Sequence, residues 1–287
     1  MQDFGNITVV SVTGLNDTRG AVNALELTRR QMRGARALLL SPHVPDALPS
    51  GIRHREIDAM DYFGYSRFIM FDLWKFIDTP FTLIVQDDGW LLDIGNWSDE
   101  FFGYDYIGAP LATGQVETRH GATSLSGFGW IEHLNKPDTI VRPVLNGGFS
   151  LRSRRLLRAL IDHPEIGADY PPASASNSEP AQTERHATIA NEDVQLSVVL
   201  RPRLEAVGLK FPPPELCARF AVEDVSPIHE GMNAMKLLGL HGWWRRLVSI
   251  DPPIVRYGVS RALIDASPGE QAIVAMLERR GYRVELT

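Results

Sequence analysis

Short apolar runs alternate with amphipathic stretches in the N-terminal third of the chain. Apolar runs at residues 7–13 and 35–40 predict strands, and residues 53–57 are expected to add a short third strand. Residues 18–32 and 62–77 carry apolar positions at helical spacing. This order of strand, helix, strand, strand and helix is typical of a doubly wound α/β fold with right-handed crossovers. We therefore expect a mostly parallel central sheet that is flanked by helices.

The next apolar run leads directly into acidic residues. Residues 81–85 are mostly β-branched or aromatic, and Gln86, Asp87, Asp88 and Gly89 follow them. Ligands of open α/β sheets bind at this end of a strand. Because side chains alternate along a strand, Gln86 and Asp88 are predicted to point one way and Asp87 the other. An ordinary Asp-Gly turn that closes the strand explains the same residues.

The pattern is weaker further along the chain. Residues 111–142 are rich in Gly, Thr and Ser and have no long period, so we expect loops there. Residues 144–151 resemble a strand that is broken by Gly147 and Gly148, and a helix is expected from residue 153 to 161. Glycines inside a strand often mark a close approach of the backbone to a ligand, but a bulge gives the same pattern.

The remaining segments are predicted from capping and composition. Residues 164–190 are rich in Pro, Ser and Ala and are expected to form a loop. Asn191 is expected to cap a helix that runs through residues 194–200, with Glu192 and Asp193 in its first turn. The other expected elements are a strand at 209–211, a helix at about 269–280 and a strand at 282–286.

Composition excludes several classes of protein. With 287 residues, the chain can form one large α/β domain or two small ones. A net charge of -6 argues against a nucleic-acid binder that depends on general attraction to phosphates. The single cysteine, Cys217, excludes an internal disulfide framework and a cysteine-based zinc site.

The sequence also suggests a location. We find neither the charged and apolar regions of a signal peptide nor an apolar run as long as a membrane span. We therefore expect a cytoplasmic protein. A peripheral contact with the inner face of the membrane is open through Trp243, Trp244, Arg245 and Arg246, although the sequence favours tryptophans that close the end of a core.

Four features could carry chemistry, although each has an ordinary structural explanation. They are the acidic strand end, the double glycine after Asn146, the Glu192-Asp193 pair and His241 in a glycine-flanked segment. Asp193 could simply be a helix N-terminal charge, and His241 could be a histidine that is satisfied within the core. No G-x-G-x-x-G or G-x-x-x-x-G-K-[ST] motif follows the first strand, so dinucleotide and P-loop sites lack support.

Taken together and in order, these motifs resemble a family of proposed glycosyltransferases with the GT-A fold, long known as a domain of unknown function. The resemblance covers roughly residues 6–245. It rests on residues 86–89 (QDDG), 97–102, 104–110 (YDYIGAP), 146–153 (NGGFSLRS), 192–193 (ED) and 239–242 (GLHG). It implies a domain at residues 1–245, with residues 246–287 as an extension that packs on it.

The resemblance further implies a metal-assisted donor site. The acidic strand end corresponds to a D-x-D element that holds a cation on the donor diphosphate. Gln86 stands in place of its first Asp, so Asp88 is left as the natural ligand and Asp87 as a ribose or supporting contact. His241 matches a late histidine ligand. Carboxylate, water and phosphate oxygens suit Mg²⁺ or Mn²⁺, and a histidine favours Mn²⁺.

Other roles follow from the same resemblance. Asp193 would be the general base that takes the proton of the acceptor hydroxyl, and Glu192 would orient or cap it. Asn146, Gly147 and Gly148 would lie against the donor sugar.

The remaining candidates are contacts with the donor and the acceptor. Thr13 is a candidate contact to the nucleotide base or ribose, and Arg152 a candidate contact to the diphosphate. Trp90 and Trp243 could stack on an acceptor sugar, but core packing explains them equally well.

We therefore expect a metal-assisted, inverting, hexosyltransferase-like enzyme. It would move a sugar from a nucleotide-diphosphate sugar, most simply a UDP-sugar, to a glycan hydroxyl in polysaccharide biosynthesis. The alternatives are a nucleotidyltransferase and a non-catalytic nucleotide- or glycan-binding module. A nucleotidyltransferase would need a basic glycine-rich loop after the first strand, and residues 14–17 (GLND) are not basic. The donor sugar, acceptor, linkage and oligomeric state stay open.

Overall fold

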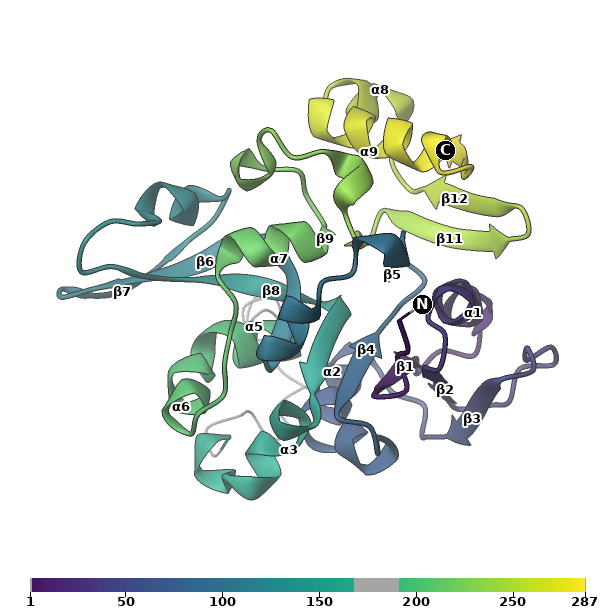
Figure 1. Ribbon diagram of the computed structural model, residues 1–287, viewed down its shortest axis with the longest axis horizontal. Coiled ribbons are helices and arrows are strands. Elements are labelled where there is room, and N and C mark those ends of the chain that lie inside the picture. The colour runs from purple at the N-terminus through teal and green to yellow at the C-terminus, as the bar shows by residue number, and fades with distance from the viewer. Residues whose placement is uncertain (1, 168–190, 287) are drawn as a thin grey trace, which may run out of the picture.

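A seven-stranded mixed sheet forms the centre of the molecule in the computed structural model, which describes residues 2–167 and 191–286 (Figure 1). Its strand order is β3-β2-β1-β4-β8-β6-β7. The strands are β1 (Ile7–Val12), β2 (Arg36–Ser41), β3 (Ile52–Glu56), β4 (Phe81–Ile84), β6 (Tyr106–Thr118), β7 (Gly121–Leu125) and β8 (Ile140–Ser153). The α/β fold class is confirmed. The sheet is mixed rather than mostly parallel as we expected. It is parallel from β3 to β4, whereas β8 and β7 are antiparallel to their neighbours.

Helices cover both faces of the parallel strands. They are α1 (Arg19–Gln31), α2 (Tyr62–Phe71) with a following 3-10 turn (Leu73–Phe76), and α3 (Arg154–Asp162). Val9 of β1 belongs to the hydrophobic cluster that contains Leu25 of α1, whereas Val10 belongs to the cluster that contains Ile69 of α2 and Leu157 of α3. Neighbouring residues of β1 thus face opposite layers, as expected for a strand that is buried on both sides.

The structure corrects the prediction of loops at residues 111–142. Half of this segment belongs to β6, β7 and β8, and Figure 1 shows β6 and β7 projecting from the body as an arm. β6 pairs with both β7 and β8, so the strands satisfy each other's backbone groups. The side chains of β7 are mostly exposed, which removes the apolar alternation that would have revealed the strand.

The predicted strand at 209–211 is also wrong. This segment forms no strand ladder. Asp105 N–H donates to the Lys210 carbonyl at 2.7 Å, and Lys210 N–H donates to the side-chain Oδ2 of Asp105 at 2.8 Å. The predicted helix at 194–200 is split into α5 (Glu192–Val194), a π-helical turn (Gln195–Val199) and α6 (Arg201–Ala206). Most of the predicted loop at 164–190 lies outside the described residues.

A small second sheet brings distant segments together. It has the order β5-β10-β9, with β5 (Gly89–Leu91), β10 (Gly239–His241) and β9 (Ala221–Val222), and α7 (Pro214–Phe220) leads into β9. His241 pairs with Gly89 in this sheet. The histidine is therefore held beside the acidic turn that follows β4.

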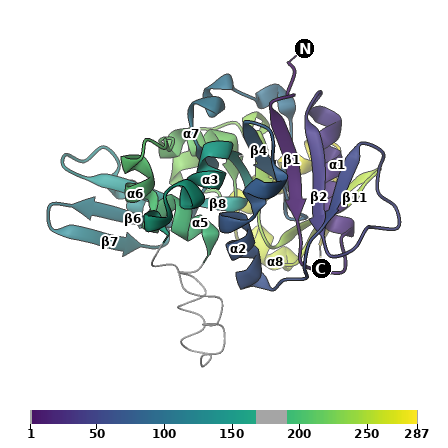
Figure 2. The same ribbon diagram turned by 90° about the horizontal axis from the view of Figure 1, so that it is seen from below.

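The C-terminal segment forms a third sheet that packs on the same body. It contains β11 (Arg245–Ile250), β12 (Pro253–Tyr257) and β13 (Arg283–Leu286), together with α8 (Arg261–Asp265) and α9 (Pro268–Arg279). In Figure 2, β11 and α1 lie at the same end of the molecule, away from the β6–β7 arm. The predicted C-terminal helix and strand are confirmed to within one residue. The predicted domain boundary after residue 245 stays a prediction.

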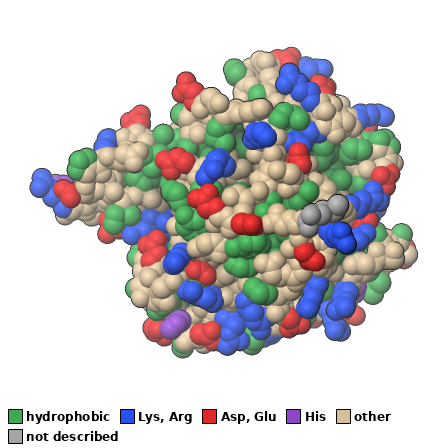
Figure 3. Space-filling view, viewed as in Figure 1, with side chains coloured by type: hydrophobic (Ala, Val, Ile, Leu, Met, Phe, Trp, Pro, Cys, Tyr) green, Lys and Arg blue, Asp and Glu red, His purple; other side chains and the backbone are tan. Residues whose placement is uncertain are grey.

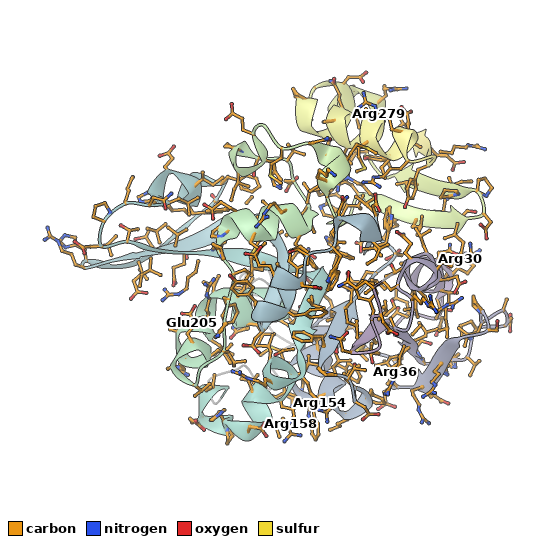
Figure 4. The ribbon with its side chains drawn as sticks, in the orientation of Figure 1. Arg30, Arg36, Arg154, Arg158, Glu205 and Arg279 are labelled. Carbon is orange, nitrogen blue, oxygen red and sulfur yellow. The ribbon has the colours of Figure 1, made fainter. Side chains whose placement is uncertain are left out.

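Individual contacts join this segment to α1 and to the second sheet. Arg30, labelled on α1 in Figure 4, pairs with Asp251 at 2.9 Å. The indole N–H of Trp90 donates a hydrogen bond to the Tyr282 hydroxyl at 3.2 Å. The C-terminal segment is therefore anchored to both α1 and β5.

The surface carries charges of both signs. On the face that Figure 3 shows, Lys and Arg side chains are interspersed with Asp and Glu rather than gathered into one basic surface. In the described part of the chain, none of the helices has the length and apolar character needed to cross a membrane.

Candidate active site

The acidic residues after β4 lie at the tip of a tight turn. Gln86 and Gly89 exchange backbone hydrogen bonds at 2.8 and 2.9 Å, which leaves Asp87 and Asp88 between them. Asp88 and Gln86 approach His241, whereas Asp87 forms an ion pair with Arg246. The predicted alternation of these side chains is confirmed.

His241 lies between two carboxylates. Its Nε2 is 3.3 Å from Asp88 Oδ1, and its Nδ1 is 3.2 Å from Glu223 Oε2. Burial alone would lower the pKa of His241, but the charges of Asp88 and Glu223 outweigh it and raise that pKa to about 10. In the same way, His241 keeps the pKa of Asp88 below its ordinary value despite burial of the carboxyl group.

Asn146 braces this arrangement from β8. Its Oδ1 accepts hydrogen bonds from the backbone N–H groups of Gly148 and Phe149 at 2.7 and 3.0 Å. Its Nδ2 donates to Glu223 Oε2 at 2.6 Å and lies 2.8 Å from His241 Nδ1. The amide is thus used by the protein itself, which corrects the expectation of a direct donor contact.

The paired glycines make room for side chains of this chain. A Cβ at Gly148 would lie 2.3 Å from Gln86 Oε1 and 2.5 Å from His241 Nε2. A Cβ at Gly147 would lie 2.1 Å from Glu192 Oε1. We predicted that a donor sugar requires these glycines, but the space beside them is taken by the polar side chains of the site.

Arg152 is buried rather than exposed on a helix. It lies in β8 with none of its surface accessible, and its Nη2 donates to Glu192 Oε1 at 2.9 Å. Its Nε donates to Ser150, and its guanidinium lies over the ring of Tyr106. The predicted diphosphate contact is therefore corrected, because this group is committed to holding Glu192.

Asp193 has the electrostatic character of a base. Burial, followed by the negative charges of Glu192 and Glu223, raises the pKa of Asp193 to about 7, although the Val194 N–H that donates to its Oδ1 at 2.7 Å acts against this. A carboxyl group with such a pKa is poised for proton transfer near neutral pH. Asn191 precedes the helix as predicted, but its side chain makes no capping hydrogen bond.

The turn and β10 together offer a cation three donor atoms. Asp88 Oδ1 is buried and accepts no hydrogen bond within residues 2–167 and 191–286. Gln86 Nε2 donates to the Tyr65 hydroxyl at 2.7 Å, so its Oε1 is left beside Gly148 and His241. Neighbouring ligands of an octahedral cation with ~2.1 Å bonds lie roughly 3 Å apart, which matches the separation of Asp88 and His241.

The candidate cation ligands are unusual because only one of the three is a carboxylate. The described residues contain no group of three or more His, Cys, Asp and Glu side chains arranged to hold a metal. The third donor is therefore the neutral amide oxygen of Gln86. An amide and a carboxylate oxygen with an imidazole nitrogen suit Mg²⁺ or Mn²⁺ when phosphate oxygens complete the coordination. Because the two carboxylates favour protonated His241, a cation would have to displace the proton from its Nε2.

The remaining candidates are scattered around the site. Thr13 lies at the same sheet edge as Asp88 because β1 and β4 are parallel, and its hydroxyl accepts a hydrogen bond from Leu15 N–H at 3.1 Å. Trp90 is fully buried, so it offers no face to a sugar and that prediction is corrected. Trp243 is 65% exposed and directly follows the segment that carries His241.

Sequence reasoning missed two residues of the site. Glu223 follows the apolar Ala221–Val222 strand, and this change from apolar to acidic residues is the signal that also marked Asp88. Tyr62 is 62% exposed, and desolvation of its hydroxyl with the charges of Asp193 and Glu192 raises its pKa to about 12. Its hydroxyl is therefore within electrostatic reach of Asp193, which no sequence pattern revealed.

Comparisons with known proteins place the chain in a family. A family model described as "Protein of unknown function (DUF5672)" matches residues 56–241, a range that includes Gln86, Asp88, Asp193 and His241. No curated protein is similar enough to the chain to count as a match.

Solved structures give a more distant likeness. One match is a galactosyltransferase, LgtC, in complex with donor and acceptor sugar analogues, with 10% identity, 95% of each chain covered and a TM-score of 0.46. Another is an active-site mutant of LgtC, with 11% identity, 95% of each chain covered and a TM-score of 0.44. Likeness at this level does not bear on activity.

Proposed function

The chain belongs to the family described as a protein of unknown function (DUF5672), and from the site of this member we propose that it is a glycosyltransferase. It moves a sugar from a nucleoside-diphosphate sugar, with a UDP-sugar as the expected donor, to a hydroxyl group of a glycan. The reaction is inverting and serves polysaccharide biosynthesis. The observation that carries the proposal is a carboxyl group with a raised pKa, Asp193, within electrostatic reach of the Glu223–His241–Asp88 chain.

The chemistry of the transfer supports this assignment. An acceptor hydroxyl attacks the anomeric carbon as the bond to the diphosphate breaks, and the hydroxyl proton has to go to a base. Asp193 takes that proton, because the burial and nearby charge that raise its pKa also make it a better proton acceptor. Glu192, held by buried Arg152, fixes the start of the helix that carries Asp193.

The leaving diphosphate needs positive charge nearby. Asp88, His241 and Gln86 would hold Mn²⁺ or Mg²⁺, and the bound cation would neutralise the charge that develops on the diphosphate. The chain's own residues set the geometry. Glu223 fixes which ring nitrogen of His241 faces Asp88, and Tyr65 fixes the amide of Gln86.

Exposed side chains suggest where the two substrates lie. Thr13 is the proposed contact to the nucleotide, because it lies at the same edge as Asp88. Trp243 and Tyr62 are the exposed aromatic groups near Asp88 and Asp193, and they are proposed to stack on the acceptor sugar. A cytoplasmic location and a peripheral membrane contact through Trp243 stay predictions.

Turnover in an Asp193→Asn variant tests the proposal. Purified protein is incubated with UDP-, GDP- and TDP-sugars and Mn²⁺, and the release of nucleoside diphosphate is measured with and without glycan acceptors. We expect release by the wild type and a loss of about 100-fold or more in Asp193→Asn, in line with removal of a general base. The matched control is Asp162→Asn, an exposed carboxylate on α3.

Two results contradict the proposal in different ways. Unchanged release by folded Asp193→Asn removes the base assignment. Nucleotide binding by the wild type without turnover of any donor and acceptor would instead identify a non-catalytic binding module.

A further inference from the structure

Arg245 ties the C-terminal helix to the two strands that carry the candidate site. It is fully buried at the start of β11. Its guanidinium donates to the backbone carbonyl of His241 at 2.7 Å and to that of Glu223 at 2.8 Å. The same group donates to both carboxylate oxygens of Glu270 in the first turn of α9, at 2.5 and 3.2 Å. One cation thus joins three separate segments.

The backbone around Arg245 also holds the acidic turn. Gly242 N–H donates to the carbonyl of Asp88 at 2.9 Å, and Leu247 N–H donates to the carbonyl of Asp87 at 2.7 Å. Arg245 lies between these two donors and closes its own turn through a hydrogen bond to the Gly242 carbonyl. The segment that Arg245 fixes is therefore the frame on which the turn and His241 are set.

Glu270 decides whether Arg245 can stay buried. In the described part of the chain, Glu270 is the one carboxylate that forms an ion pair with Arg245. A buried guanidinium without a carboxylate partner is strongly unfavourable, so loss of Glu270 would draw Arg245 towards water. Glu270 also accepts a hydrogen bond from the Trp244 indole at 3.3 Å, which fixes the neighbouring loop.

We propose that Arg245 and Glu270 are positioning residues for the candidate cation and donor site, and that the C-terminal helix acts as a clamp on it. The clamp sets the distance between Asp88 and His241 by holding the backbone on both sides. The inference rests on the proposed function only in naming a cation and a nucleotide-sugar donor as the ligands of the site. It assigns a role to the C-terminal segment.

A nearby ion pair provides the matched control. Glu285 in β13 pairs with Arg256 in β12 at 3.1 Å, within the same C-terminal sheet. Neither residue has a hydrogen bond or ion pair to the site among those found in the described residues. A general loosening of the C-terminal sheet would follow from Glu285→Gln as well, whereas the clamp is specific to Glu270.

The test compares Glu270→Gln with Glu285→Gln in the full chain. The ring ¹⁵N and ¹H resonances of His241 are recorded by NMR with histidine-labelled protein and are assigned with a His241→Gln spectrum. Mn²⁺ affinity is measured from the free-ion signal in electron paramagnetic resonance, and circular dichroism confirms folding. We expect Glu270→Gln to shift the His241 resonances and to weaken Mn²⁺ binding by about 10-fold or more, with Glu285→Gln unchanged.

Unaltered His241 resonances and Mn²⁺ affinity in folded Glu270→Gln would overturn the clamp, as would equal effects of Glu285→Gln. If Glu270→Gln does not fold, Glu270→Asp keeps the charge but shortens the reach. The clamp predicts that the His241 resonances of Glu270→Asp differ from those of the wild type. Resonances identical to those of the wild type would contradict the clamp. If the wild type binds no Mn²⁺, the proposed cation site fails, while the His241 spectra still decide the clamp.

Discussion

Asp88 Oδ1 and His241 Nε2 lie 3.3 Å apart although they come from a turn after β4 and from a strand near the C-terminal segment. Pairing of β5 with β10 produces this approach, because His241 is the partner of Gly89 in that ladder. Residues that attract a cation are thus placed by backbone hydrogen bonds rather than by local sequence. Variants that disturb the approach should impair binding before they impair the fold.

Gly148→Ala is expected to abolish binding at the site. The added Cβ would lie within 2.5 Å of Gln86 Oε1 and His241 Nε2, so at least one of them has to move. We expect a loss of about 1–3 kcal/mol in the free energy of unfolding, which is typical of overpacking, together with loss of Mn²⁺ binding. Urea unfolding and metal titration measure the two effects. Gly103→Ala is the control, since nothing lies within 4 Å of its added Cβ.

Arg152→Met is expected to destabilise the protein by about 3–5 kcal/mol, because it leaves the buried carboxylate of Glu192 without its cation. Arg256→Met breaks an exposed ion pair with Glu285 and should change stability by less than about 1 kcal/mol. Urea denaturation at pH 7 compares the two. Equal effects would show that Glu192 does not depend on Arg152.

The pH dependence of turnover should follow Asp193. A general base works in its deprotonated form, and the pKa of Asp193 is raised to about 7. We therefore expect kcat/KM to be low in mild acid and to increase as pH rises through that value. A profile measured from pH 5 to 9 checks this, with circular dichroism at each pH. A profile that is flat from pH 5 upwards would contradict the assignment.

The raised pKa of Asp193 also predicts that the folded protein gains stability when the negative charge of this carboxylate is removed. Between the ordinary value of 3.8 and about 7, the folded protein keeps a proton that the unfolded chain has lost. Stability therefore falls as pH rises through this window. Asp193→Asn cannot ionise, so its Tm at pH 8 should exceed that of the wild type by a few degrees, on the order of what one buried group contributes. At pH 4 the difference should nearly disappear in thermal unfolding curves.

The parallel half of the fold could be predicted because its signals are local. Residues 7–13 and 81–85 are dense in apolar residues and end in turn residues, so their strands follow from composition and position. The strand β7 escaped prediction because its backbone groups are satisfied by β6 while its side chains mostly face solvent. Pairing with β6 stabilises β7, and local periodicity does not show it.

The candidate site, like the fold, could be predicted only in part from local sequence. Asp88, His241 and Asp193 were predicted from motifs, and the structure brings Asp88 and His241 together. Arg152 was predicted to contact the diphosphate, and only the structure shows that it is buried between Glu192 and Tyr106. The role of Gly147 and Gly148 depends on which side chains fill the space beside them, and this is a tertiary property.

Thermal unfolding with nucleotides and metal tests the central claim most directly. Wild type and Asp88→Asn are heated with UDP, GDP, TDP or CMP in the presence of Mn²⁺, Mg²⁺ or EDTA, because a ligand that binds only the folded state raises the Tm. We predict that one nucleoside diphosphate, with UDP as the expectation, raises the Tm of the wild type only with the metal. Asp88→Asn should lose this shift. No shift of the wild type with any nucleotide and metal would contradict a donor site at Asp88 and His241.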